Sequence, residues 1–533
     1  MNFLILLLPF SGFIIDVATL IGYGIYTVYK RFPFLLHVAA ASLFAGFGIF
    51  LFACFPVGSV STKFVLLGVM GVGLSLLVTG LKNFFDDGWN FSMTDGGTNK
   101  LGVTIIIPAF NEEKTIAECI ESAFDQTLPP EKVIVVDDGS TDRTGEIVRS
   151  LQKKYPNLHY IRKPKQQGKG RNVSETVMTE DISPVFVVLD ADVPITRDYL
   201  EKVVEEFKNE NTVIVTGASD PQRPLFFEGK ISTNGKYFLF NLFGFRKKAQ
   251  DIRNSVSVIC GDSAAYRTDY IRSIGGFPSG TLTEDVDVTW QALEDGKRVK
   301  CRMDANARPY DVYNISGHWR QVNRWYKGNT QCMFKHGRRI FKSKRLAFTT
   351  ILPMWLDSIF YVPFYIFSPL IFLWSPFTAM GFLLLDFLLL VIFSALVDRS
   401  GLTHLFEVYF ARFIWSTAWL SASIVTTVDY LRGKGKNWVG KWSRPKRKGF
   451  DILAPVVIFG ALGWFLANSY FVLVFINQSG WYPWILLPLL LFVPSAINLV
   501  YQFFRYGVFK RTVLDILWDT DGRVRVNPIL TQE

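Results

Sequence analysis

Cysteine is scarce in this chain, with five residues in 533, and none of them stands in a CxxC or CxH spacing. This pattern argues against a zinc site and against a disulfide framework. It fits a reducing cytosol, in which we expect every cysteine to be structural. The five are Cys54, Cys119, Cys260, Cys301 and Cys332.

The sequence also lacks internal repeats and low-complexity tracts, which argues against a transporter built from repeated halves. Apolar residues, in contrast, make up 49% of the chain, and its mean hydropathy is +0.22. Such a chain is too long for one domain and too apolar for an ordinary soluble enzyme. The formal net charge of +11 then indicates cytoplasmic loops at an anionic membrane surface rather than nucleic-acid binding.

Apolar blocks of membrane-spanning length, roughly 20 residues, lie at both ends of the chain. Three precede a more polar middle and five follow it. They lie near residues 3–28, 34–56, 63–81, 346–375, 377–397, 404–427, 452–476 and 482–503.

Basic residues predict the orientation of these blocks. Lys and Arg between the first two blocks place that loop in the cytoplasm, and the segment after residue 81 with it. The stretch 432–448 holds eight Lys or Arg and no acid, so it should also be cytoplasmic. Three membrane crossings between these two segments would place them on opposite sides of the membrane, although both are predicted to be cytoplasmic. We therefore expect block 404–427 to lie along the interface, because Glu407 and Arg412 would be costly at bilayer depth.

The predicted domains follow from this layout. They are N-terminal membrane helices 1–81, a cytoplasmic domain 82–345, C-terminal membrane and interface helices 346–503, and a cytoplasmic tail 504–533.

The middle of the chain alternates short β-branched runs with polar, helix-length stretches, which is typical of a parallel α/β sheet with crossover helices. The runs are continuously apolar, as expected for strands buried on both faces. Functional sites in such sheets lie at the carboxyl ends of the strands. The predicted strands are 103–110, 132–140, 158–163 and 185–192, and the first helices lie within 112–126 and 142–155.

Two carboxylate pairs follow predicted strands. Asp137 and Asp138 precede a Gly-Ser turn, where Asp138 could accept a hydrogen bond from a nucleotide base or could simply end a strand before a capped helix. Asp190 and Asp192 project the same way if the backbone stays extended. Two such acids can hold Mg²⁺ or Mn²⁺ together with substrate phosphates, although an isolated DxD is common by chance.

A third acidic cluster, TEDVD, contains Glu284, Asp285 and Asp287. These acids could complement the dipole at a helix N-terminus. Alternatively, one of them is a general base that takes a proton from a sugar hydroxyl, because a carboxylate close to other acids has a usefully raised pKa.

The motifs FNEE, DDGSTD, GKGRN, DAD, TED and QVNRW occur in one order between residues 110 and 325. In this order they resemble family 2 glycosyltransferases, in particular the membrane-embedded synthases of cellulose, hyaluronan, chitin oligosaccharides and poly-N-acetylglucosamine. The resemblance covers about 100–345 by motif and the flanking blocks by layout. It implies a GT-A domain, a Rossmann-like mixed α/β sheet, inserted between N- and C-terminal transmembrane helices, with a nucleotide-sugar donor and Mg²⁺ or Mn²⁺.

The resemblance also implies roles for individual residues. Asp285, with Glu284 beside it, would be the catalytic base, and Asp192 would bind the metal. Gln321 and Trp325 of the QxxRW motif would bind the acceptor, with the Trp stacked on a sugar at the mouth of a membrane channel. The residues expected to bind the nucleotide sugar are Asp138, Lys169, Arg171, Asp190 and Arg324.

The basic loop 433–449 resembles a cytoplasmic segment that closes over the nucleotide in related synthases. Trp438, Lys441 and Arg444 are its candidate gating residues, and a polybasic patch on anionic lipid is the alternative interpretation. The chain departs from the family at Asp262, where a small neutral residue is expected beside the acceptor. We expect no cyclic-dinucleotide receptor domain after the last apolar block, so regulation of that kind would need an accessory subunit.

The expected function is an inverting, metal-dependent processive synthase in the plasma membrane with its catalytic domain in the cytoplasm. It would polymerise a sugar from a UDP-sugar, with UDP-N-acetylglucosamine favoured by the TEDVD segment, and translocate the polysaccharide. The alternatives are a hyaluronan or cellulose-type synthase and a non-processive transferase acting on a lipid such as ceramide. A transporter that senses nucleotide sugars ranks below these. Membrane lipids would surround the protein, and no nucleic-acid partner is expected.

Overall fold

The computed structural model describes residues 10, 16–18, 101–222, 227–310, 312, 314–396, 403–433 and 452–479. All of these except 16–18 belong to one compact unit made of residues 1–12 and 97–533. Nearly all of the predicted N-terminal membrane helices and of the basic loop, together with the block 482–503 and the cytoplasmic tail, lie outside the described residues. Trp438, Lys441 and Arg444 are among these, so their gating role stays a prediction.

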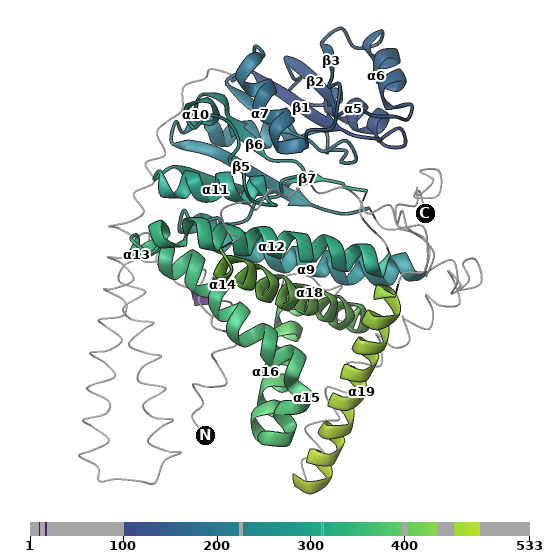
Figure 1. Ribbon diagram of the computed structural model, residues 1–533, viewed down its shortest axis with the longest axis vertical. Coiled ribbons are helices and arrows are strands. Elements are labelled where there is room, and N and C mark those ends of the chain that lie inside the picture. Colours follow the sequence, from purple (N-terminus) through teal and green to yellow (C-terminus); the bar gives the residue numbers. More distant parts are fainter. Residues whose placement is uncertain are drawn as a thin grey trace. The chain divides into compact units, whose positions relative to one another are not determined.

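A seven-stranded mixed sheet forms the centre of the described middle domain, in the order β3-β2-β1-β4-β6-β5-β7 (Figure 1). The four strands predicted from β-branched runs are all present within the predicted ranges. The strands are β1 Val103–Ala109, β2 Lys132–Asp137, β3 Leu158–Arg162, β4 Val185–Val188, β5 Thr212–Ser219, β6 Ala265–Arg267 and β7 Arg298–Ala307.

The expectation of a wholly parallel sheet, drawn from the strand pattern, was wrong at one strand, and the mixed sheet implied by the family resemblance is present. β6 pairs antiparallel with both β4 and β5. β6 is only three residues long and enters from the GDSA loop rather than from a crossover helix. The connection from β5 to β6, residues 220–264, is long enough for a parallel crossover, so its length does not reveal the antiparallel direction.

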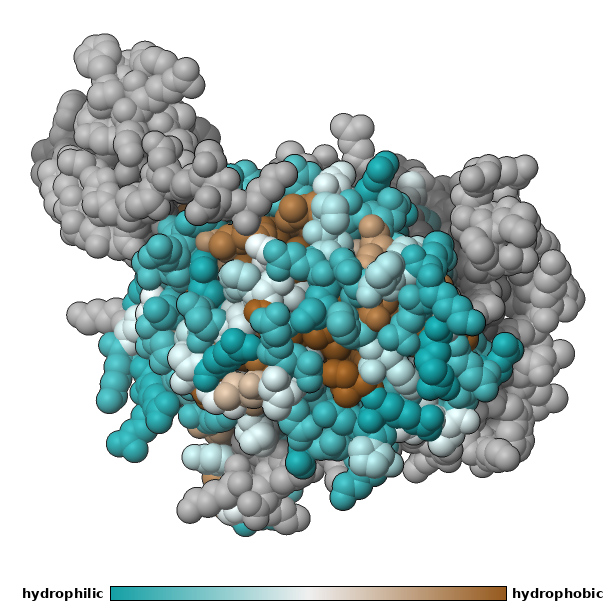
Figure 2. All heavy atoms as spheres, turned by 90° about the horizontal axis from the view of Figure 1, so that it is seen from above, coloured by the Kyte–Doolittle hydropathy of each residue, from teal (hydrophilic) through white to brown (hydrophobic). Residues whose placement is uncertain are grey.

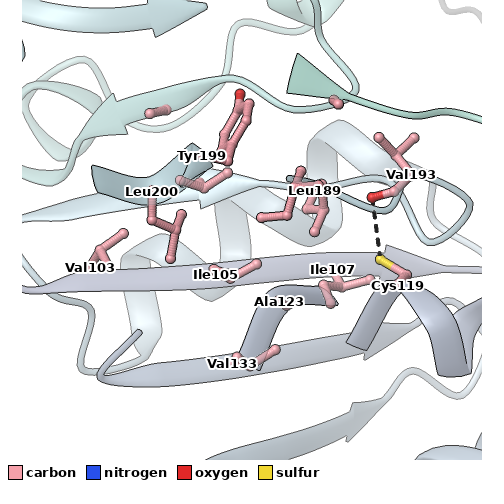
Figure 3. Close-up of a cluster of buried hydrophobic side chains, with 14 of the residues drawn as sticks. Val103, Ile105, Ile107, Cys119, Ala123, Val133, Leu189, Val193, Tyr199 and Leu200 are labelled. Carbon is pink, nitrogen blue, oxygen red and sulfur yellow. Dashed lines mark hydrogen bonds between the residues drawn. The ribbon is translucent and has the colours of Figure 1, made fainter. Parts of the chain in front are cut away.

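Helices cover both faces of the sheet, and alternate residues of β1 point to opposite faces. Ile105 and Ile107 pack with α5 and α8 on one face, and Ile106 packs with α7 and α11 residues on the other. Figure 3 shows part of the first core, which includes Tyr199 and Cys119. The helices of this domain are α5 Ile116–Phe124, α6 Thr144–Gln152, α7 Lys169–Thr179, α8 Tyr199–Glu205, α10 Thr268–Ser273 and α11 Glu284–Glu294.

Three long helices, α9, α12 and α18, lie together beneath the sheet in Figure 1, and α18 packs against both of the others. Other helices run more nearly vertically in the same view. The long helices are α9 Phe227–Ile252, α12 Ile315–Ile340 and α18 Leu405–Leu431, and the more vertical ones include α15 Val362–Trp374, α16 Pro376–Leu396 and α19 Leu453–Ser479.

Among the described residues, two helical stretches are long and apolar enough to cross a membrane, Thr349–Trp374 and Leu453–Phe475. A π-helical turn, Ala347–Ile351, overlaps the start of the first stretch, and a second, Asp357–Tyr361, lies within it. Both stretches fall in predicted membrane blocks. Leu373 and Phe459 on these stretches are 70% and 69% exposed. Such exposure of large apolar side chains is unfavourable in water and is typical of a surface that contacts lipid or protein.

The predicted interface helix 404–427 corresponds to α18. Its two charges are buried inside the protein, since Glu407 is 1% exposed and Arg412 pairs with Asp386 of α16. Nothing in the described arrangement fixes its depth in a membrane, so its interfacial position stays a prediction.

Candidate active site

A cavity of about 2120 Å³ opens at the carboxyl edge of the sheet and extends to α12 and α18. It brings together all ten predicted site residues that the structure describes. These are Asp138, Lys169, Arg171, Asp190, Asp192, Glu284, Asp285, Gln321, Arg324 and Trp325. Figure 2 looks down on the sheet domain, where the described surface is mainly hydrophilic with separate apolar patches.

Asp138 follows β2 and anchors the GKGRN loop. Its carboxylate oxygens accept hydrogen bonds from the backbone N–H groups of Gln167 (2.7 Å) and Gly168 (2.9 Å). Gly139 follows with φ +82°, a conformation that favours glycine. Each carboxylate oxygen has a second lone pair, so Asp138 can hold this loop and still accept a hydrogen bond from a ligand.

Lys169, at the start of α7, contacts both the DAD motif and the loop that contains Gly261. Its Nζ lies 2.6 Å from Asp190 Oδ1 and donates to the carbonyl oxygen of Gly261, also at 2.6 Å. Burial lowers its pKa, but Asp190 and Glu284 outweigh this and raise the pKa above its usual value. Lys169 is therefore a fixed cation among acids. Arg171 is more exposed and pairs with Glu175 at 2.8 Å.

The DAD motif forms a turn rather than an extended strand end. β4 ends at Val188, and the N–H of Val193 donates to the carbonyl oxygen of Asp190 at 3.0 Å. The extended backbone assumed for the i, i+2 argument was wrong, although both acids do line the cavity. Cys119 supports the turn from α5, because its thiol donates to the carbonyls of Asp190 and Val193, the second bond being visible in Figure 3.

The TED motif opens α11, which begins at Glu284 with Thr283 as its N-cap residue. Asp285 packs against Gly261 so closely that a Cβ added there would lie 2.1 Å from Oδ2. Burial, together with the charge of Glu284, raises the pKa of Asp285 to about 6, against the opposing effects of Lys169 and Arg324. A carboxylate with such a pKa is ionised at neutral pH and is still basic enough to take a proton.

Asp262, the departure noted in the sequence, lies in the same cavity beside Asp190. Its backbone carbonyl accepts from the N–H of Asp190 at 2.8 Å. Burial and the charge of Asp190 raise the pKa of Asp262 to about 6. This part of the wall is therefore more acidic than a small neutral residue would make it.

Asp287 of the same segment does not line the cavity. It is fully buried and accepts hydrogen bonds from Thr281 Oγ1, Lys335 Nζ and His336 Nε2 at 2.7–2.9 Å. The acids of TEDVD thus divide between the cavity and a structural contact with α12.

The QxxRW residues share one face of α12, as their i, i+3, i+4 spacing requires. Gln321 Oε1 accepts a hydrogen bond from Lys236 of α9 at 2.6 Å. Trp325 lies 6.1 Å from Trp415 of α18, centroid to centroid, in an edge-to-face arrangement. The sequence reasoning missed Lys236 and Trp415 because no motif contains them and only the packing of α9 and α18 on α12 brings them here.

A divalent cation is compatible with the carboxylates present. Asp190 and Asp192 offer hard oxygen donors at the cavity wall. Within the described ranges no three His, Cys, Asp or Glu side chains form a ready-made metal cluster. Mg²⁺ can be held by one or two protein carboxylates, with substrate phosphates and water completing its coordination.

Part of the sheet domain matches a known family. The model of the family described as "Glycosyl transferase family 2" matches residues 104–275, which include β1 to β6 and the DDGSTD, GKGRN and DAD motifs. The chain contains a family 2 glycosyltransferase domain. The enzyme class inferred from the sequence is thereby confirmed.

Curated relatives of this glycosyltransferase include two poly-beta-1,6-N-acetyl-D-glucosamine synthases. The chain is 24% identical over 262 residues to that of Staphylococcus epidermidis and 23% identical to that of Staphylococcus aureus strain COL. Each match covers 49% of this chain and 62% of the relative. Among solved structures, the mannosyltransferase PcManGT of Pyrobaculum calidifontis, in complex with GDP-Man and Mn²⁺, matches with a TM-score of 0.44 and 19% identity, covering 63% of this chain and 89% of that one.

Proposed function

We propose that the protein is an inverting synthase that builds a polysaccharide from a UDP-sugar, with UDP-N-acetylglucosamine as the favoured donor. The observation that carries this proposal is the position of Asp285 in the wall of one cavity shared by the donor-side and acceptor-side motifs. The relatives named as N-acetylglucosamine polymer synthases support the choice of sugar.

In the proposed mechanism, Asp285 takes the proton of the attacking acceptor hydroxyl as the new glycosidic bond forms. Direct displacement inverts the anomeric carbon, so a single base is sufficient. Lys169 and Arg324 are the cations that stabilise the negative charge of the departing diphosphate. Asp138 and Arg171 lie at the nucleotide side of the cavity.

Asp192 would hold the divalent cation, with Asp190 beside it bound to Lys169. When bound, such an ion neutralises charge that develops on the diphosphate leaving group. Asp190, which lines the cavity and has one carboxylate oxygen 2.6 Å from Lys169 Nζ, would contact the nucleotide sugar.

The acceptor side of the cavity supports a growing chain. Besides Trp325, the wall includes Trp415, Trp419 and Asp357, and Asp357 lies within the first candidate span. Aromatic rings offer sequence-independent stacking surfaces for sugars, and the span offers a route toward the membrane. We therefore place the protein in the plasma membrane with this domain in the cytoplasm and infer translocation of the product.

The test is a reconstitution of the full chain in lipid with Mn²⁺ or Mg²⁺ and a panel of UDP-sugars, recording UDP release and product size. A long product from UDP-N-acetylglucosamine alone, lost in Asp285→Asn, is the expected result. Product that requires two donors would identify a hyaluronan-type synthase. A single transfer that needs added lipid would identify a lipid glycosyltransferase, and absence of UDP release with every donor would refute the proposal.

A further inference from the structure

Lys236 is a fully buried lysine at the acceptor end of the cavity, although it does not line the cavity itself. Its ammonium donates to Gln321 Oε1 at 2.6 Å. The same Nζ lies over two aromatic rings, 5.5 Å from the Trp325 centroid and 5.7 Å from that of Phe240. The Lys236 side chain of α9 thus contacts both Gln321 and Trp325, the acceptor-side residues of the QxxRW motif.

This contact determines how the amide of Gln321 is oriented. An ammonium has three donors and no acceptor, so it must face the amide oxygen. The NH₂ group of Gln321 therefore points away from Lys236. Gln321 also lines the cavity, so the side of its amide turned away from Lys236 carries the donor rather than the acceptor. A sugar hydroxyl oxygen or an acetamido carbonyl oxygen is the matching ligand group.

The same ammonium occupies one face of the Trp325 indole. A cation over an aromatic ring contributes about 0.5–2 kcal/mol, depending on desolvation. The ring contacts Trp415 edge to face as well. Trp325 is thus held by Lys236 and by α18 before any acceptor arrives, which reduces the ordering cost of binding.

Lys236 cannot easily shift along the helix interface. Its neighbour Gly235 packs against α18, where an added Cβ would lie 2.1 Å from the backbone oxygen of Glu407. Asn234, the residue before that glycine, has its Nδ2 atom 3.4 Å from His404 Nδ1. The backbone beneath Lys236 is therefore fixed against α18 by close approach.

We propose that Lys236 is a positioning residue that orients Gln321 and Trp325 to receive the acceptor saccharide. This inference rests on the proposed function, because it assumes that a sugar binds at the QxxRW motif. It predicts an effect confined to the acceptor, since Lys236 contacts Gln321 and Trp325 on the acceptor side of the cavity.

The test compares Lys236→Met with Lys300→Met in the full chain reconstituted in lipid. Lys300 also contacts α9, through an ion pair with Asp251 at 2.7 Å, but it lies outside the cavity lining. Binding of a β-1,6-linked N-acetylglucosamine pentasaccharide is measured by titration calorimetry. UDP release from UDP-N-acetylglucosamine is measured with and without that pentasaccharide.

We expect Lys236→Met to raise the pentasaccharide Kd and its KM about tenfold or more. The donor KM and the UDP release without acceptor should stay within about twofold, and Lys300→Met should leave all four unchanged. Unchanged pentasaccharide binding in Lys236→Met would overturn the inference while leaving the proposed function intact. A wild type that neither binds the pentasaccharide nor releases UDP would refute both.

Loss of folding is checked by thermal unfolding of both variants. If Lys236→Met does not fold, Lys236→Gln takes its place, because Gln retains a donor but carries no charge. An intermediate rise in the pentasaccharide Kd for Lys236→Gln supports the positioning role. A Kd equal to that of the wild type would overturn the need for the cation.

Discussion

His336 Nε2 lies 2.7 Å from Asp287 Oδ1 in a buried ion pair that joins α12 to α11. The other ring nitrogen, Nδ1, lies 2.9 Å from Glu294 Oε1 at the end of α11. Both nitrogens face carboxylates, so both must carry a proton for each contact to be a hydrogen bond. α11 carries Asp285 and α12 carries Arg324, so this ion pair helps to set the two sides of the cavity.

The stability of this contact should depend on pH. Burial lowers the pKa of His336, but the hydrogen bonds to Asp287 and Glu294 outweigh it and raise the pKa above 6.5. A raised folded-state pKa contributes stability that is complete below about 6.5 and is lost as pH rises through the folded value. Burial raises the pKa of Asp287, but His336 and Lys335 outweigh it and lower the pKa below 3.8, so its contribution is lost only in stronger acid.

We therefore predict that His336→Gln lowers the stability most between about pH 4 and 6.5, by about 3 kcal/mol, the usual cost of removing one partner of a buried pair. The measurement is the apparent Tm in detergent across pH. Arg339→Gln is the control, because Arg339 is exposed and its contact with Glu294 is longer, at 3.5 Å. A constant difference from pH 5 to 9 would show that folding does not raise the pKa of His336 and would contradict the prediction.

Substitution of the proposed base should abolish transfer and not donor binding. We predict that Asp285→Asn lowers kcat about 10²–10⁴-fold with little change in the Kd of the UDP-sugar. In the wild type, kcat/KM should fall about tenfold per pH unit below about 6, where Asp285 becomes protonated. Steady-state UDP release from pH 5 to 8 measures this limb, and full activity at pH 5 would contradict the assignment.

Much of the domain could be predicted from sequence because its signals are local. The first four strands follow from β-branched runs, and the ten described site residues, picked out by short local motifs, line one cavity. The antiparallel β6 could not be predicted, because three residues carry no periodic pattern. Lys236 was missed for another reason: its partners on α12 are 85 residues away, and only helix packing joins them.

The charge argument for block 404–427 shows a second limit. In the sequence Arg412 is an isolated charge and therefore a cost of spanning the membrane, whereas in the structure it pairs with Asp386 of the preceding block. A paired charge in the interior carries far less penalty than an isolated one. Composition alone therefore cannot say whether α18 spans or lies at the interface.

Removal of the proposed metal ligand should change the ion dependence of the reaction. We predict that Asp192→Ala raises the Mn²⁺ or Mg²⁺ concentration for half-maximal rate about tenfold or more, since one of only one or two protein ligands is lost. The matched control is Asp220→Ala, an acid in the same cavity that is outside the DAD motif. An equal shift in both variants would indicate a general charge effect, and no shift in Asp192→Ala would exclude Asp192 as the ligand.

Removing one partner of the Arg412–Asp386 pair should lower the stability strongly, whereas replacing both partners by apolar residues should lower it little. Arg412 Nη1 donates to Asp386 Oδ2 at 2.9 Å, and the carboxylate is 2% exposed. Asp386→Leu alone leaves a buried guanidinium without its carboxylate and should cost about 3–5 kcal/mol. Asp386→Leu combined with Arg412→Met replaces both charges by apolar groups and should recover most of that loss. Thermal unfolding of the two single variants and the double variant in one lipid mixture gives the coupling energy. Additive losses would show that the two side chains do not interact, and the link that they provide between α16 and α18 would then be excluded.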